Sequence, residues 1–139
     1  MTEAAEDVRT VTIEREIGYP PEKIWRALTT PHLLQEWLMQ NDFAAEPDHV
    51  FQFRGDWGAV DCRVVAVEPP VSLSYTWGAM GLESLVTWTL TPTAGGTHLR
   101  MDHTGFRKDQ EQAYQGAKFG WKRMIGTLEE VLAREESAA

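Results

Sequence analysis

The sequence has little cysteine and a shortage of positive charge, and each shortage excludes a class of protein. Cys62 is the single cysteine among 139 residues, so neither an intrachain disulfide nor a zinc site built from several cysteines can form. This fits a reducing compartment, and we expect a cytoplasmic protein. The 13 Lys and Arg are outnumbered by 21 Asp and Glu, and the resulting net charge of -8 disfavours nucleic acids and anionic membranes as partners.

Export signals and long apolar runs are also missing. Residues 1–7 are polar and acidic, without the basic and apolar regions of a signal peptide. No stretch approaches the roughly 18 apolar residues of a membrane span. A chain of this length usually forms one domain. We therefore expect a disordered N-terminal lead over residues 1–7 and a single domain over residues 8–139.

Apolar and polar residues alternate with period two through much of the chain, the pattern of half-buried antiparallel strands. The first such run covers residues 8–17 and puts Val11, Ile13 and Ile17 on one face. Similar runs, separated by turns rich in Gly and Pro, cover residues 50–54, 60–66, 71–77, 85–90 and 98–103. In the third run we expect the inner face to carry Val60, Cys62, Val64 and Ala66. The pattern predicts a meander of six or seven strands.

Three other segments have helical periodicity. Pro21 opens a first short helix, and Thr30 as N-cap with Pro31 at the first helical position opens a second. From about Asp109 to Glu135 apolar residues recur every 3.6 positions, which predicts a long amphipathic helix. Its apolar stripe consists of Ala117, Gly120, Trp121, Met124, Ile125, Leu128, Val131 and Leu132. One face of the sheet is the large apolar surface available to bury this stripe, so the sequence predicts an α+β protein.

Several motifs, in their order along the chain, resemble the activator of heat-shock-protein-ninety ATPase homologue family. They span roughly Thr10 to Arg134 and are IWRALTTP (24–31) with EWL (36–38), VEPP (67–70) with LSYTW (73–77), GTHL (96–99) with HTGF (103–106), and Gly120-Trp121 with Leu128. The resemblance implies the START-related (SRPBCC) helix-grip fold that birch-pollen allergen also has. In that fold a curved antiparallel sheet of six or seven strands wraps around one long C-terminal helix, and two short helices lie between strands 1 and 2.

One position departs from the family's pattern. Many relatives resemble one another in a Gly-Gly pair ahead of the Phe-rich strand, whereas this chain has Asp48 and His49 there. Paired glycines often permit a β-bulge, so the pairing register near Phe51 is left open by the sequence.

Aromatic side chains are abundant, with six Trp, five Phe and three Tyr. Many fall on inward positions of the strands or on the helical entry, opposite small residues of the long helix. Large rings facing small side chains leave room between them, and apolar aromatic cavities bind small molecules. We expect the cavity to be lined by Trp37, Met39, Phe53, Tyr75, Trp77, Trp88, Met101, His103, Ala117 and Gly120.

Candidate chemical groups are few. His103 is the titratable side chain predicted to point inward on a central strand, either as an acid or base or as a hydrogen-bonded core residue. His98 falls on the opposite face of the same strand, so the two cannot bind one metal ion. We predict no metal and no cofactor, and Cys62 as a buried apolar residue. Arg15, on the apolar side of the first strand, should meet a carboxylate or reach the sheet edge.

Three functions are compatible with this sequence. The favoured one is non-catalytic binding of a small hydrophobic or aromatic ligand between the sheet and the long helix. The resemblance implies a second, a chaperone partner and a role in the stress response, because the family's namesake stimulates a chaperone ATPase. The third is a cyclase- or hydrolase-type enzyme using His103 with Tyr75 or Asp61, although neither a nucleophile elbow nor a phosphate loop is present. We expect a monomer or homodimer.

Overall fold

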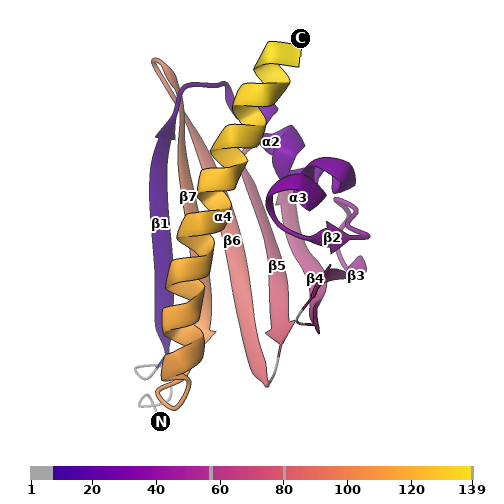
Figure 1. Ribbon diagram of the computed structural model, residues 1–139, viewed down its shortest axis with the longest axis vertical. Helices are drawn as coiled ribbons and strands as arrows, with labels where there is room; N and C mark the ends of the chain where they lie inside the picture. Colours follow the sequence, from indigo (N-terminus) through magenta and orange to yellow (C-terminus); the bar gives the residue numbers. More distant parts are fainter. Residues whose placement is uncertain (1–7, 57, 80, 139) are drawn as a thin grey trace.

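One antiparallel sheet and one long helix dominate the computed structural model, which describes residues 8–56, 58–79 and 81–138 (Figure 1). The elements are β1 (Arg9–Ile17), α2 (Pro21–Thr29), α3 (Pro31–Trp37), β2 (Gln40–Asn41), β3 (Val50–Gly55), β4 (Gly58–Glu68), β5 (Ser72–Ala79), β6 (Leu82–Thr93), β7 (Gly96–Phe106) and α4 (Glu111–Ala138). The predicted α+β class, with two short helices after the first strand and a long C-terminal helix, is confirmed. The lead predicted over residues 1–7 lies outside the described residues.

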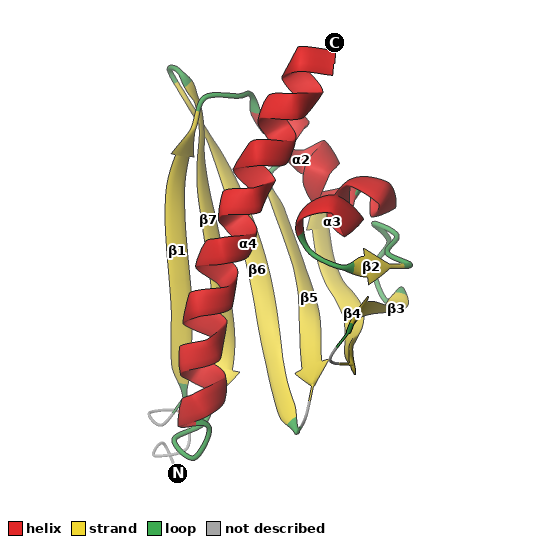
Figure 2. Ribbon diagram, in the orientation of Figure 1, coloured by secondary structure: helices red, strands yellow, loops and turns green. Residues whose placement is uncertain are grey.

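The sheet has seven strands in the order β1-β7-β6-β5-β4-β3-β2, so the first strand pairs with the last. All three helices lie on the same face of the sheet, with α4 running obliquely over β1, β7 and β6 and with α3 toward the β4 side (Figure 2). The outer face carries polar side chains. For example, Thr12 donates a hydrogen bond of 2.7 Å to Asp102 across the β1–β7 pair.

Strand alternation buries the inner face of the sheet, but α4 contributes to this core only from Trp121 onward. In β6 the inward Val86, Trp88 and Leu90 are at most 1% exposed. The buried residues of α4 are Trp121, Ile125, Leu128, Val131 and Leu132. No residue of the preceding segment, 111–120, is buried. Residues 111–120 of α4 therefore stand over the sheet without contributing a buried side chain, which leaves space beneath them.

A bulge in β4 overturns one sequence-based assignment. Ala66 was expected on the inner face with Val60, Cys62 and Val64. The pairing of β4 with β5 shifts register between Val64 and Ala66, so Ala66 is exposed while Val67 is half-buried. An extra residue in one strand reverses which face the following side chains occupy. The prediction for Ala66 was wrong for this reason.

The register near Phe51, left open above, is regular. Residues 50–55 of β3 pair one-to-one with β4. Just before them the Asp48 N–H donates to the Val64 carbonyl at 2.8 Å, and the Val64 N–H donates to the His49 carbonyl at 2.9 Å. Two residues thus face one, which is a bulge, and Asp48 has φ +71°. Asp tolerates this left-handed conformation better than most residues, so the bulge forms here without a glycine.

Two further expectations concern the helix start at Thr30 and the charge at Arg15. Thr30 occupies the N-cap position of α3 and Pro31 its first position, as predicted, but the Thr30 side chain makes no capping hydrogen bond. Arg15 lies half-exposed on the edge strand β1, and its Nε lies 3.9 Å from a carboxylate oxygen of Glu129 on α4. Arg15 therefore reaches the sheet edge and meets a carboxylate there.

Candidate functional site

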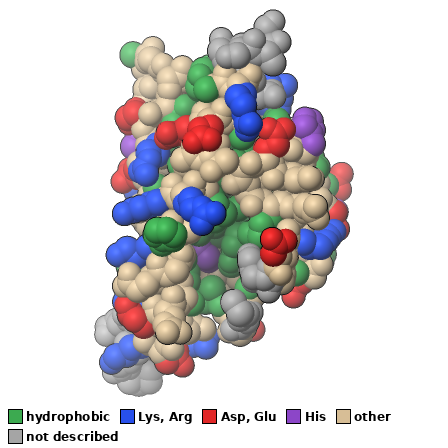
Figure 3. Space-filling model, viewed as in Figure 1, with side chains coloured by type: hydrophobic (Ala, Val, Ile, Leu, Met, Phe, Trp, Pro, Cys, Tyr) green, Lys and Arg blue, Asp and Glu red, His purple; other side chains and the backbone are tan. Residues whose placement is uncertain are grey.

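A cavity of about 1090 Å³ opens between the first half of α4, α3 and the sheet. Figure 3 shows it as a hollow with hydrophobic side chains in its depth and Lys and Arg side chains beside it. Its aromatic and aliphatic wall is formed by Trp37, Leu38, Met39, Trp77, Ala79, Leu82, Phe106, Ala113, Ala117, Trp121 and Met124. A concave apolar surface of this size is typical of small-molecule sites.

Small residues of α4 keep this space open. Gly116, Ala117 and Gly120 all lie on the cavity wall. A Cβ atom placed on Gly116 would meet nothing within 4 Å, and one on Gly120 would meet Met124 Cε alone, at 3.9 Å. Glycine inside a helix destabilises it by about 1 kcal/mol relative to alanine. Nothing in the packing of the described residues requires the two glycines, and their effect is to leave the cavity wide.

The structure separates the ten residues predicted to line a cavity into two groups. Those on the wall are Trp37, Met39, Trp77, His103, Ala117 and Gly120. The remaining four are at most 1% exposed and pack in the core, away from the wall: Phe53, Tyr75, Trp88 and Met101. The Trp88 indole donates to the Tyr75 hydroxyl at 3.0 Å, and the Trp88 ring meets Trp37 edge-on at 5.7 Å. Contact between the wall residues and a ligand stays a prediction.

Sequence reasoning missed several wall residues because the strands are longer than predicted. β5 continues to Ala79 and β7 to Phe106, beyond the expected ends at residues 77 and 103. Gly105, at φ +121°, lies where the β1–β7 register shifts, and this shift turns Phe106 inward. A glycine inside a strand pattern is a sign of such a bulge, so Gly105 was the available signal.

His103 lies on the wall, but its ring is 1% exposed and hydrogen-bonded at both nitrogens. The Trp121 indole N–H donates to Nδ1 at 2.9 Å. Nε2 lies 2.8 Å from Ser84 Oγ, which donates to the Trp77 carbonyl at 2.7 Å. Because an indole can only donate, Nδ1 must be unprotonated, and the neutral ring donates from Nε2 to Ser84. Burial lowers the pKa of His103 to about 4, so the ring is neutral at neutral pH.

This tautomer makes His103 a poor base for Ser84. A general base must accept the nucleophile's proton, whereas Nε2 already carries one and points it at the serine. The other groups considered for catalysis lie elsewhere. Asp61 is exposed and lines a separate hollow of about 500 Å³, and it accepts a hydrogen bond of 2.6 Å from Gln52. Tyr75 is buried in the core, and burial raises its pKa.

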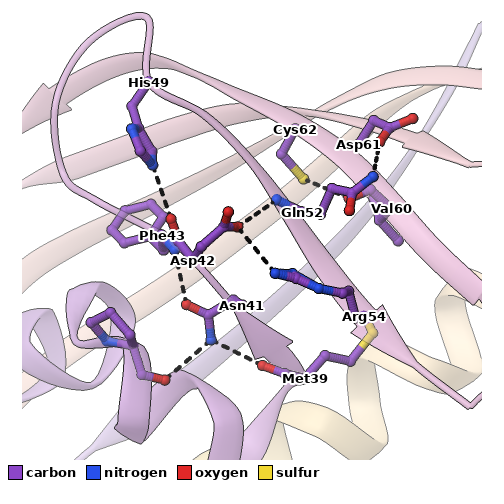
Figure 4. A network of polar contacts seen from close by, with 11 residues as sticks. Met39, Asn41, Asp42, Phe43, His49, Gln52, Arg54, Val60, Asp61 and Cys62 are labelled. Atoms are coloured by element: carbon purple, nitrogen blue, oxygen red, sulfur yellow. Dashed lines mark hydrogen bonds and ion pairs between the residues drawn. The ribbon is translucent and has the colours of Figure 1, made fainter.

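A second polar cluster joins β2 to β3 (Figure 4). The Asn41 amide donates to two backbone carbonyls, at 3.0 and 3.1 Å. Asp42 Oδ1 accepts from the Gln52 backbone N–H at 2.9 Å and lies 3.9 Å from Arg54 Nη2. The Gln52 N–H above all, and then the Arg54 charge, lower the pKa of Asp42. The His49 ring meets the Asp42 carbonyl at 2.9 Å. These bonds anchor the edge strand β2, so the cluster has a structural role.

Metal and thiol chemistry have little support in the described part of the chain. No group of three or more His, Cys, Asp and Glu side chains there is placed to hold a metal ion. His98 lies on the outer face and bonds to Glu16 and Glu14, which raise its pKa. Cys62 is buried, and burial raises its pKa to about 12, so it is a protonated and weakly reactive thiol.

Among the described helices, none has the length and apolarity needed to cross a bilayer.

Comparison with known proteins places this geometry in a family. The family model described as "Activator of Hsp90 ATPase homolog 1-like protein" matches residues 18–133. The chain is similar to the crystal structure of protein MLL2253 from Mesorhizobium loti, with 55% identity, a TM-score of 0.89, and coverage of 91% of this chain and 98% of that one. It is also similar to the solution structure of protein BH1534 from Bacillus halodurans, with 27% identity, a TM-score of 0.80, and coverage of 89% and 96%. No curated protein matches.

Proposed function

We propose that this chain, which belongs to the Activator of Hsp90 ATPase homolog 1-like family of the SRPBCC helix-grip superfamily, binds a small hydrophobic or aromatic ligand without chemical conversion. The observation that carries the proposal is the apolar cavity of about 1090 Å³ between α4, α3 and the sheet. Three tryptophan side chains line the cavity, Trp37, Trp77 and Trp121, and each is at most 8% exposed.

Burial of apolar surface would drive binding. Each square ångström of apolar surface removed from water contributes roughly 25 cal/mol. A ligand with the area of a fatty acid or a polycyclic aromatic molecule would therefore gain several kcal/mol from the wall. Part of that gain offsets the lost freedom of the ligand, so micromolar affinity is the expectation. The flat rings of Trp77 and Trp121 also favour stacking with an aromatic ligand.

The hydrogen bonds of His103 favour binding over catalysis. Both ring nitrogens have protein partners, and the proton sits on the nitrogen that a Ser84 nucleophile would need free. His103 is neutral, and both of its ring nitrogens are used by hydrogen bonds within the protein, so the structure gives it no free base or acid at the wall.

A chaperone-binding role is the second candidate, and one exposed side chain favours it. Phe119 on α4 is 69% exposed, the largest exposure among the large apolar side chains described. It lies among basic residues, Lys118, Lys122 and Arg123. A partner that covered this position would bind outside the cavity. Retention of the cell's own Hsp90 by the immobilised protein, lost in Phe119→Ser and kept when the cavity is blocked, would support this role.

A cavity-blocking variant tests the ligand-binding proposal. Gly120→Phe adds a ring on the wall, where the Cβ has room, and Gln115→Phe adds the same ring at an exposed position of α4 outside the cavity. Fatty acids, flavonoids and polyketide-like aromatics are screened by thermal shift and by intrinsic Trp fluorescence. We expect at least one class to bind the native protein and Gln115→Phe, with binding lost in Gly120→Phe. No binding by any class, or equal binding by both variants, would contradict the proposal.

A further inference from the structure

The charged side chains at the cavity wall differ in whether they already have partners. Four of them line it: Glu36, Asp109, Glu111 and Arg123. Three are carboxylates, and each meets an arginine. Glu36 lies 3.4 Å from Arg134, Asp109 lies 3.6 Å from Arg107, and Glu111 accepts a hydrogen bond of 2.6 Å from Arg9.

Arg123 is the exception. Within residues 8–56, 58–79 and 81–138, no carboxylate lies within ion-pair distance of its guanidinium, and no hydrogen bond or ring contact of this group is recorded. This happens in a chain with a net charge of -8, in which acidic side chains are plentiful. The described carboxylates that line the same cavity each lie within ion-pair distance of another arginine. The positive charge at the cavity is therefore available to something that is not part of the fold.

The position of Arg123 on α4 places it beside the space that the glycines leave. Gly120 and Thr127 are one helical turn before and after it, and all three line the cavity. Met124, the next residue along the chain, supplies apolar wall at the same level. A molecule lying along this part of α4 would meet apolar surface at Met124 and Trp121, with a cation at its end.

We infer that the ligand is amphipathic and carries an anionic head, a carboxylate, which pairs with Arg123 while its apolar body lies against the tryptophan wall. This inference rests on the proposed function and adds the chemical class of the ligand. The guanidinium group presents a planar fork of N–H donors that matches a carboxylate in two parallel hydrogen bonds. The carboxylates that could pair with a cationic ligand already pair with arginines. A neutral ligand would leave the Arg123 guanidinium without an ionic partner.

Matched ligands and matched variants test the inference. The probes are dodecanoic acid and dodecan-1-ol, which share an apolar body and differ in the head group. Dissociation constants are measured at pH 8 and low salt by quenching of Trp fluorescence. The variants are Arg123→Gln, Arg123→Lys and the control Lys122→Gln, which removes the same charge from an exposed neighbour that does not line the cavity.

We expect the native protein and Lys122→Gln to bind the acid about fivefold to tenfold more tightly than the alcohol, as a partly exposed arginine–carboxylate pair provides. The preference should disappear in Arg123→Gln, with affinity for the alcohol unchanged, and persist in part in Arg123→Lys. Equal binding of acid and alcohol by the native protein would overturn the inference and leave the ligand-binding proposal standing. An equal loss of preference in Lys122→Gln would overturn it as well, because general electrostatic attraction would explain the result. Binding of neither probe would count against both proposals.

Discussion

Protonation of His103 should weaken the fold as the pH falls below about 6.5. In the folded chain burial holds the pKa of His103 at about 4, against an ordinary value near 6.5 in the unfolded chain. The unfolded state therefore takes up the proton first, and stability is lost as the pH drops from about 6.5 to about 4. The contacts act in the same direction as burial, because a proton on Nδ1 would face the Trp121 N–H, a donor against a donor.

The size of the effect follows from the same two pKa values. For one proton, the free energy of unfolding falls by about 1.4 kcal/mol for each pH unit in this interval. Acidification to pH 5 then removes about 2 kcal/mol, and the whole interval removes about 3 kcal/mol. A domain of this size has a total stability of about 5–15 kcal/mol, so the loss is easily measured.

Urea unfolding followed by Trp fluorescence at pH 7, 6 and 5 measures it, with His103→Gln as the comparison. A glutamine side chain offers a carbonyl oxygen to Trp121 and an amide N–H to Ser84, and it does not titrate. The other titrating groups are the same in both proteins, so their contributions to the pH dependence of the free energy of unfolding cancel in the comparison. We expect the native protein to lose about 2 kcal/mol more than the variant between pH 7 and pH 5. Equal losses in the two proteins, or an NMR titration that places the His103 pKa near 6.5, would refute the reasoning.

Three other predictions follow from single contacts. Two glutamates of β1 raise the pKa of His98 in the folded chain, so His98 should stabilise the fold at pH values below about 6.5 and lose that effect as the pH rises through the folded pKa. His98→Gln should therefore lower the melting temperature more at pH 6 than at pH 9. A larger decrease at pH 9 than at pH 6 would contradict this prediction. Gly96→Ala should lower the free energy of unfolding, measured in urea, by about 3 kcal/mol, because the added Cβ would lie 2.9 Å from the Gly18 Cα. A decrease below about 0.5 kcal/mol would show that the β1–α2 connection can shift to make room for the Cβ. Cys62 should react with Ellman's reagent in urea and not in native buffer, and rapid native labelling would contradict its burial.

Much of the architecture is determined by patterns that are local in the sequence. Alternation in residues 71–77 and 85–90 is enough to place Tyr75, Trp77 and Trp88 on the inner face, and the 3.6-residue period from Asp109 is enough to define the apolar stripe of α4. Local patterns fail where the backbone inserts a residue. The bulges after Val64 and at Gly105 reverse the facing of Ala66 and Phe106, and they arise from pairing with a distant strand.

The division between core and cavity was decided by the tertiary structure. Tyr75 and Trp77 have the same parity on one strand, yet Tyr75 is packed in the core and Trp77 lies on the cavity wall. The periodicity of a strand predicts which face of the sheet a residue occupies. The position at which α4 contacts that face depends on all the contacts along the helix and along the sheet, and this position decides which inward residues lie in the core and which line the cavity. The charge of Arg123 has the same origin, because its lack of a carboxylate partner among the described residues depends on where Glu36, Asp109 and Glu111 meet their arginines in space.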